Sequence, residues 1–241
     1  MPTAVIVGAT APLAPFLAER FAAGGFDLVL AARRPSVLDK LVARLGKTWP
    51  VKVTRLSLDA ADAESVQAFI TLLGQHPPDV VVTLLGRQQH AAEPDPDELT
   101  QLIDSNLTQP AALIERVATV LAAAGRGTII GVSSIVGDRG RSKNYAYGAG
   151  KAGLTAYLSG LRQRLNAAGV RVMTVKPGPI FVEGRAQSHP GWLMATPERV
   201  AGDIYRGWAR GSQVVYTPRY WRWLMLGVRL IPESMFRRMR F

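Results

Sequence analysis

The sequence predicts one α/β domain built as a three-layer, doubly wound parallel sheet. Apolar runs of strand length alternate six times with longer stretches of helical period, the pattern of repeated strand–helix–strand units. The strand segments are apolar at successive positions, as expected for strands that helices cover on both faces. The 241 residues contain no internal repeat and no low-complexity linker. We therefore expect residues 1–241 to form a single domain.

Strands are expected where a short apolar run stands between polar or glycine-containing segments. In chain order, the expected strands are 3–7, 27–32, 51–57, 79–85, 127–132, 170–176 and a shorter one near 213–216. The stretches between them carry apolar residues at helical spacing. The expected helices are 12–24, 36–46, 62–74, 97–123, 146–168 and 197–210. Pro12 is compatible with the first of these, because proline is tolerated in the first turn of a helix.

The composition excludes several classes of protein. Without cysteine, the chain has no disulfide framework, no cysteine-ligated zinc and no thiol nucleophile. His76, His90 and His189 are isolated in the sequence, so we expect surface histidines and no metal site. No Gly-Lys-Ser/Thr follows a strand to form a P-loop. The chain begins without signal-peptide features and has no uncharged apolar run of about 18 residues, so a soluble, cytoplasmic protein is expected.

Ligands of doubly wound sheets bind beyond the carboxyl ends of the strands, so the residues after each strand are informative. The turn from Gly8 into the first helix would aim backbone N–H groups at a phosphate; an ordinary strand-to-helix turn is the alternative. Arg33 and Arg34 follow the second strand, where arginine accommodates the 2′-phosphate of a dinucleotide, and two solvated arginines are the alternative. Asp59 follows the third strand, placed either to contact an adenine edge or to cap helix 62–74.

Three side chains between residues 133 and 151 form a catalytic pattern. Tyr147 and Lys151 stand four residues apart, so both project from one face of a helix. A tyrosine with its ordinary pKa of about 10 is a poor acid at neutral pH, and we expect the Lys151 ammonium to lower that pKa. Ser134 follows the fifth strand and can donate a hydrogen bond to a carbonyl oxygen. Together they supply an acid, a group that tunes it and an oxyanion-type donor.

These motifs resemble the short-chain dehydrogenase/reductase family in its single-domain form, over essentially the whole chain. They occur in the family's order: the Gly8 turn, Asp59, Gly86, Asn106, Ser134, Tyr147, Lys151 and Pro177-Gly178. The resemblance implies a Rossmann-type fold and reduction of a ketone with NAD(P)H. NADP(H) is expected in preference to NAD(H), which remains the alternative, because Arg33 and Arg34 favour a 2′-phosphate. The family usually assembles as dimers or tetramers, so a homo-oligomer is expected.

The resemblance also implies roles for individual residues. Tyr147 is the expected general acid, Lys151 tunes it and holds the nicotinamide ribose, Ser134 orients the carbonyl, and Asn106 supports a water-mediated proton relay. The cofactor-binding set it implies is Gly8, Thr10, Leu13, Arg33, Arg34, Asp59, Gly86, Tyr147, Lys151, Pro177, Gly178 and Ile180.

The chain departs from the family pattern at several cofactor positions. Pro12 and Ala14 replace two glycines of the first loop, Leu84-Leu85 replaces an Asn-Ala pair, and Val182 stands where a threonine is frequent. A nucleotide-sensing or membrane-surface binding protein with weak catalysis is therefore the alternative function. Segment 183–196 stands where a substrate lid would be, and a loop without that role is the alternative.

The C-terminal residues carry a disproportionate share of the charge. The chain has a net charge of +11, and residues 219–241 hold six arginines against one glutamate, a net +5. Segments 133–148 and 216–238 resemble a subgroup that contains a decaprenylphosphoryl 2-keto-ribose reductase. That resemblance implies a keto-sugar carried on a polyprenyl phosphate as the substrate.

A helix from residue 219 to Pro232 is expected to be amphipathic. Arg219, Arg222 and Arg229 would share one face, and an apolar face would hold Trp223, Leu224, Val228 and Ile231. Such a helix is typical of an interface with anionic lipid, so 218–241 is expected to touch a membrane or to form the mouth for a lipid-linked substrate. Packing on its own domain or on another subunit is the alternative. No nucleic-acid module accompanies the positive charge, so nucleic acid is not an expected partner.

Overall fold

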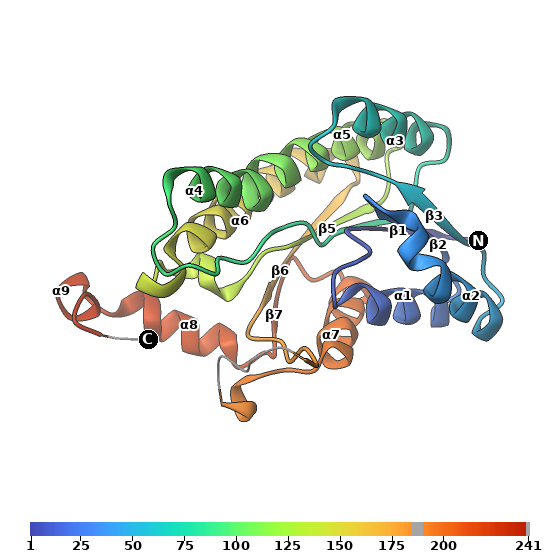
Figure 1. Ribbon diagram of the computed structural model, residues 1–241. Helices are drawn as coiled ribbons and strands as arrows, with labels where there is room; N and C mark the ends of the chain where they lie inside the picture. Colours follow the sequence, from blue (N-terminus) through green and yellow to red (C-terminus); the bar gives the residue numbers. More distant parts are fainter. Residues whose placement is uncertain (185–189, 240–241) are drawn as a thin grey trace.

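The computed structural model describes residues 1–184 and 190–239 (Figure 1). Part of the expected lid over 183–196, including His189, lies outside the described residues. Of that segment, the structure describes a short helical turn, η6 (Gly191–Leu193). No helix over the described ranges is long and apolar enough to cross a membrane.

Seven strands of the described chain form one parallel sheet, which confirms the predicted fold class. They are β1 (Thr3–Val7), β2 (Asp27–Ala32), β3 (Val53–Ser57), β4 (Val80–Thr83), β5 (Thr128–Val132), β6 (Arg171–Pro177) and β7 (Val214–Thr217). Their order is β3-β2-β1-β4-β5-β6-β7, and every neighbouring pair is parallel. Strands β2 and β3 are added on one side of β1, and β4 to β7 on its other side. Where the strand order switches sides, between β1 and β4, a crevice opens at the carboxyl ends of the two strands.

Helices cover both faces of the sheet (Figure 1). The helices packed on one face are α1 (Ala14–Ala23), α2 (Asp39–Thr48) and α7 (Pro197–Ala209), and those on the other are α3 (Ala63–Gln75), α5 (Gln109–Ala124) and α6 (Tyr145–Leu165). Successive residues of β1 belong to different cores: Ile6 packs on the α1 side, whereas Val5 and Val7 pack on the α5 side. Because side chains alternate along a strand, a sheet covered twice needs apolar residues at every position.

The expected helix 97–123 is interrupted by a wider turn. Helix α4 (Pro96–Ile103) runs into a π-helical turn, η2 (Asp104–Thr108), before α5 begins. In a regular α-helix the N–H of residue 110 would donate to the carbonyl of Asn106, but Pro110 has no N–H. The Asn106 carbonyl therefore lacks its usual helical donor. The Asn106 side-chain nitrogen separately donates to the Leu102 carbonyl, one turn earlier, at 2.9 Å. Such turns are frequent at functional sites, and this one buries Asn106 completely.

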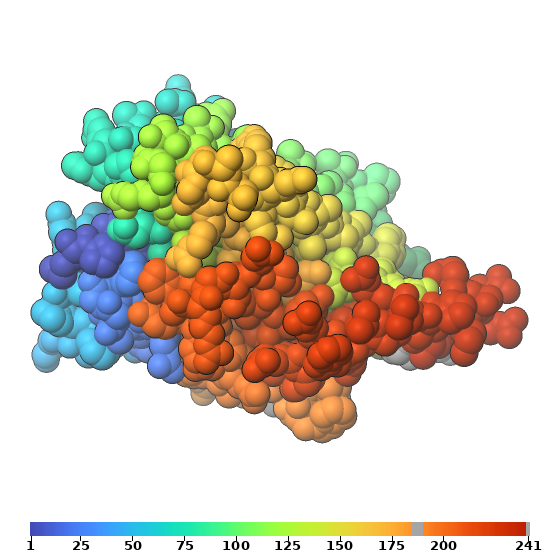
Figure 2. All heavy atoms as spheres, turned by 180° about the vertical axis from the view of Figure 1, so that it is seen from behind, coloured from blue at the N-terminus to red at the C-terminus, as the bar shows by residue number. Residues whose placement is uncertain are grey.

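The C-terminal tail packs on its own domain through one face. Helix α8 (Trp221–Leu230) buries Trp221 and Met225 against Ile135, and α9 (Glu233–Phe236) buries Phe236. Of the expected apolar face, Trp223 is 69% exposed and Leu224 40% exposed, so neither is buried in the domain. Residues 221 and 225 are one turn apart and face the domain, which turns residue 223 to the opposite side. Figure 2 shows the end of the tail extending past the body of the domain.

Arg139 holds the tail to the connection between β5 and α6. Its guanidinium donates to the carbonyls of Val228, Arg229 and Ile231 at 3.0, 3.1 and 2.6 Å, and to Glu233 Oε2 at 2.7 Å. It also lies 4.0 Å from the centroid of the Phe236 ring. The last carbonyls of a helix lack partners within the helix, so Arg139 closes the end of α8.

Candidate active site

A cleft of about 1300 Å³ lies at the carboxyl ends of the strands, where the topology places a ligand site. It extends from the turn after β1 to the tail helix α8. The expected residues that line it are Gly8, Thr10, Leu13, Arg33, Asp59, Gly86, Asn106, Ser134, Tyr147, Lys151, Pro177, Gly178 and Ile180. Arg34 is the expected residue that does not line it.

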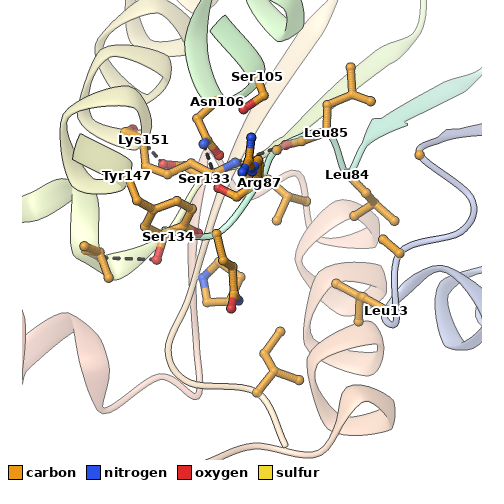
Figure 3. Close-up of a pocket in the computed structure, with 18 of the residues that line it drawn as sticks. Leu13, Leu84, Leu85, Arg87, Ser105, Asn106, Ser133, Ser134, Tyr147 and Lys151 are labelled. Atoms are coloured by element: carbon orange, nitrogen blue, oxygen red, sulfur yellow. Dashed lines mark hydrogen bonds between the residues drawn. The ribbon is translucent and has the colours of Figure 1, made fainter. Parts of the chain in front are cut away.

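Ser134, Tyr147 and Lys151 point toward one another at the centre of the cleft (Figure 3). Tyr147 lies in the first turn of α6 and Lys151 one turn later. Ser134 precedes η3 (Ile135–Asp138), and its Oγ accepts a hydrogen bond from the Val136 N–H at 3.2 Å. The Lys151 ammonium donates to the carbonyls of Leu85 at 3.1 Å and Val132 at 3.3 Å. The reactive groups are thus held by helix α6 and by the segments that follow β4 and β5.

Burial sets the charge states of the tyrosine and the lysine. Burial raises the pKa of Tyr147 above its ordinary value, and a hydrogen bond with Ser134 opposes part of this rise. Burial lowers the pKa of Lys151 to about 8. Our expectation that Lys151 lowers the pKa of Tyr147 was therefore wrong. The Lys151 Nζ lies 5.9 Å from the centroid of the Tyr147 ring and donates to two carbonyls, so loss of hydration outweighs its attraction for a phenolate.

Asn106 and Lys151 pack closely against Gly86. The Asn106 amide nitrogen donates to the Arg87 carbonyl at 2.8 Å, while its buried Oδ1 has no partner in the described chain. A Cβ at Gly86, whose φ is +143°, would lie 2.5 Å from Asn106 Oδ1 and 2.8 Å from Lys151 Nζ. Only glycine fits there. Asn106 and Lys151 both line the cleft, so an unpaired acceptor and an ammonium group are available there to a bound water.

The turn after β1 presents backbone donors to the other end of the cleft. Gly8 has φ +79° and its N–H donates to the Ala31 carbonyl at 3.0 Å. The N–H groups of Thr10 and Leu13, just before α1, form no hydrogen bond within the described residues. Free donors next to a helix N-terminus attract phosphate. Pro12 removes one donor from the turn but leaves these two.

The cleft also contains the two polar groups that follow β2 and β3. Arg33 is exposed at its rim, whereas Arg34 points elsewhere. Asp59 accepts a hydrogen bond from the Ala61 N–H at 3.0 Å. The cap of α3 is Asp62, which accepts from Glu64 and Ser65, so the alternative role of Asp59 as the helix cap is wrong.

Gln89 is a site residue that sequence reasoning missed. Its Oε1 accepts hydrogen bonds from the backbone N–H groups of Ala146 at 3.1 Å and Tyr147 at 3.2 Å. It therefore caps the helix that carries the tyrosine, since Asn144, the residue before that helix, forms no side-chain cap. Gln89 is 57 residues away from Ala146, and no local pattern signals a cap supplied from that distance.

The chain is similar to known oxidoreductases. Residues 2–190 match the model of the short chain dehydrogenase family. An uncharacterised oxidoreductase of Mycobacterium tuberculosis is 34% identical over 98% of this chain and 96% of its own. A sulfoacetaldehyde reductase of Chromohalobacter salexigens is 33% identical over 72% of this chain and 70% of its own.

The solved structures agree with these relatives. A short-chain dehydrogenase from Sphingobium yanoikuyae, determined in complex with NADPH, is 27% identical. It superposes with a TM-score of 0.82 and covers 100% of this chain and 97% of its own. Because the family model covers most of the chain and a relative that is 34% identical matches it nearly end to end, the protein belongs to the short-chain dehydrogenase/reductase family of oxidoreductases.

Proposed function

We propose that this protein reduces a ketone to an alcohol with NADPH, and that Tyr147 supplies the proton. The observation that carries the proposal is the meeting of Tyr147, Ser134 and Lys151 in the same cleft as the free donors of the β1–α1 turn. The NADPH complex of the 27% identical dehydrogenase supports the choice of cofactor. The name of the sulfoacetaldehyde reductase supports carbonyl reduction.

The residues present fit a dinucleotide along the whole cleft. The N–H groups of Thr10 and Leu13 would hold its phosphates, and Arg33 its 2′-phosphate. The lining backbone of Pro177, Gly178 and Ile180 would hold the nicotinamide end. When bound, the reduced nicotinamide supplies a hydride to the carbonyl carbon.

The protein's own side chains would hold the carbonyl oxygen of the substrate and deliver a proton to it. The Tyr147 hydroxyl is protonated at neutral pH and would give its proton to the substrate oxygen. Burial raises its pKa and makes it a weaker acid than a free tyrosine, so the transfer would rely on the strongly basic alkoxide that hydride addition creates. The Ser134 hydroxyl would donate to the carbonyl oxygen and hold it beside that proton. Lys151 and Asn106 both line the cleft, and a water bound to them would return a proton to Tyr147. Oxidation of NADPH by the purified protein over a panel of soluble and lipid-linked keto-sugars tests the proposal; no oxidation with any ketone would contradict it.

Cofactor choice is expected to depend on Arg33. Replacing Arg33 by Asp should weaken NADPH relative to NADH by about 10- to 100-fold, because a charge-assisted bond to the 2′-phosphate is lost. The ratio of Kd values for the two cofactors measures this. Arg34→Asp is the matched control, since Arg34 does not line the cleft. Equal affinity of the wild-type protein for both cofactors would contradict the assignment.

Gln89 is expected to act as a positioning residue for Tyr147. Replacing it by Ala removes the acceptor for two N–H groups of α6, which should lower kcat by about 10-fold through misplacement of the hydroxyl. The same change should lower the free energy of unfolding by about 1 kcal/mol through loss of the cap. Gln89→Glu keeps an acceptor and should retain most of the activity. A wild-type kcat in Gln89→Ala would exclude this role.

Features of the C-terminal tail support the more specific proposal that the substrate is a keto-sugar linked to a lipid. Its inner face contributes Leu224, Met225 and Val228 to the cleft. On its outer face, Trp223, Leu230 and Met235 are exposed by 69%, 74% and 60%. Arginines are exposed between and beside these apolar residues, at positions 219, 222, 229, 237 and 238. Apolar side chains interspersed with arginine favour an anionic lipid surface.

Binding of the full chain to anionic liposomes at low salt is therefore expected. Replacing both Arg219 and Arg222 by Gln should weaken binding by about 30-fold, at about 1 kcal/mol for each charge. These arginines are exposed, so the change spares the packing of Trp221 and Met225 that a truncation at Pro218 would destroy. Arg210→Gln, on the exposed end of α7, is the control. Wild-type protein that remains unbound in a sedimentation assay would exclude lipid contact.

A further inference from the structure

Arg141 is a cation in the cleft without a counter-ion. It precedes the short helical turn η4 (Ser142–Asn144), between β5 and the helix that carries Tyr147. It lines the cleft, and its buried Nε has no hydrogen-bond partner within residues 1–184 and 190–239. No carboxylate of the described chain forms a salt bridge with it. Arg139, two residues earlier, has Glu233 and three carbonyls as partners.

The partial burial of Arg141 is unfavourable in the free protein, because the side chain is half-buried and its Nε is fully buried without a partner among the described residues. Arginine remains charged in proteins, and a charge that loses water without gaining a partner raises the free energy of the folded state. Loss of hydration lowers the pKa of Arg141 below its ordinary value, and it is the only cause of that shift. A cost of this kind is expected where a ligand later supplies the missing partner.

Two further polar atoms of the same region lack partners. The Asn144 Oδ1, an acceptor, and the Trp221 Nε1, a donor, are buried and form no hydrogen bond with the part of the chain that the structure describes, and both residues line the cleft. Buried polar groups almost always have partners. Three such groups thus line the cleft along the β5–α6 connection and the start of α8, where Trp221 Nε1 lies against Gly178. We call this part of the cleft the polar subsite. The apolar side chains of Val136, Leu193, Leu224 and Val228 line the cleft with them.

This subsite is separate from the part of the cleft that suits cofactor phosphates. The free donors of Thr10 and Leu13 and the Arg33 side chain belong to the elements around β1 and β2. Arg141 belongs to the connection that Arg139 ties to α8. Figure 1 shows this connection beside α8, on the side of the molecule away from α1. The positive charge of Arg141 is therefore available to bind the substrate and not the cofactor phosphates.

We propose that Arg141 binds an oxyanion on the substrate, so that the protein acts on acidic ketones that carry a phosphate, carboxylate or sulfonate group. The planar guanidinium matches the paired oxygens of these groups. Asn144 would accept from, and Trp221 donate to, hydroxyl groups beside the reacting carbonyl. The proposal rests on the ketone reductase function proposed above and assigns its substrate class.

Matched pairs of ketones test this proposal by kinetics. The pairs are ribulose 5-phosphate with ribulose, and levulinate with its methyl ester; one tests a phosphate and the other a carboxylate. We expect the wild-type protein to prefer the anionic member of at least one pair. Arg141→Met should raise KM for that member by about 10- to 100-fold, and this rise should exceed any change in KM for the neutral member. Arg141→Lys should keep part of the preference, and Arg210→Met, far from the cleft, should keep all of it.

Calorimetric titration separates the anion subsite from the reductase function. Inorganic phosphate and levulinate are titrated into the wild-type protein, Arg141→Met and Arg33→Asp, each with and without NADPH. Binding that depends on Arg141 supports the subsite even if no ketone is reduced, an outcome that would contradict the reductase function alone. The subsite is contradicted if Arg33→Asp abolishes anion binding and Arg141→Met retains it. It is also contradicted if the wild-type protein neither binds the anions nor prefers an anionic ketone.

Discussion

Replacing Tyr147 by Phe is expected to lower kcat for ketone reduction by about 10²- to 10⁴-fold, the range for loss of a general acid. The phenyl ring retains the packing of the tyrosine in the first turn of α6, so the Kd for NADPH should stay close to the wild-type value. Steady-state NADPH oxidation and fluorescence titration with NADPH measure the two quantities. A selective loss of kcat would identify the Tyr147 hydroxyl as the proton donor.

Tyr157→Phe is the matched control on the same helix. The Tyr157 hydroxyl donates to Glu115 at 2.7 Å, and Tyr157 does not line the cleft. This variant should lose about 1 kcal/mol of stability with its hydrogen bond and keep its kcat. Normal turnover by Tyr147→Phe would exclude the mechanism. Wild-type protein that binds NADPH but reduces no ketone would instead favour a nucleotide-binding role without catalysis.

The sheet could be predicted from the sequence because burial of both its faces makes successive residues of each strand apolar. Each face of β1 belongs to a separate core, Ile6 to one and Val5 to the other, so apolar residues occur at every position. Each predicted strand begins and ends within two residues of the observed one. The spacing of Tyr147 and Lys151 is also local, since one helical turn brings the two side chains to one face.

The missed features depend on contacts between distant segments. Gln89 caps α6 across 57 residues, and Arg139 holds α8 across about 90. The register of α8 depends on which side chains meet Ile135, so its helical period alone did not identify Trp221 and Met225 as the buried residues. The π turn at Asn106 had a local signal in Pro110, but a proline also occurs at the start of an ordinary helix.

The pKa of the tyrosine was misjudged for a related reason. Sequence spacing places the Lys151 ammonium near Tyr147, but it does not show how far either group is removed from water. The structure buries Lys151 to 4% exposure, and burial then dominates both pKa values. The proximity of two groups can be read from a helix, whereas their hydration depends on the whole fold.

The burial of Lys151 leads to an expectation about stability. A lysine whose pKa falls from 10.5 to about 8 on folding costs the folded state about 3 kcal/mol at pH 7. Lys151→Met removes this cost and also the hydrogen bonds to Leu85 and Val132, which offset part of the gain. We expect the variant to be more stable than the wild-type apoprotein by about 1–3 kcal/mol at pH 7, with a higher Tm, and to lose its ketone reductase activity.

The pH dependence of this gain distinguishes the charge from simple packing. Between the folded pKa of about 8 and the unfolded value of 10.5, the unfolded wild-type chain binds more protons than the folded one, so wild-type stability rises with pH. The advantage of Lys151→Met should therefore be complete below pH 8 and shrink toward pH 10, as calorimetric scans at pH 7 and pH 10 would measure. Lys143→Met, at an exposed lysine, should change stability by less than about 0.5 kcal/mol at either pH. A gain from Lys151→Met that is equal at both pH values would show that packing, and not the buried charge, is responsible.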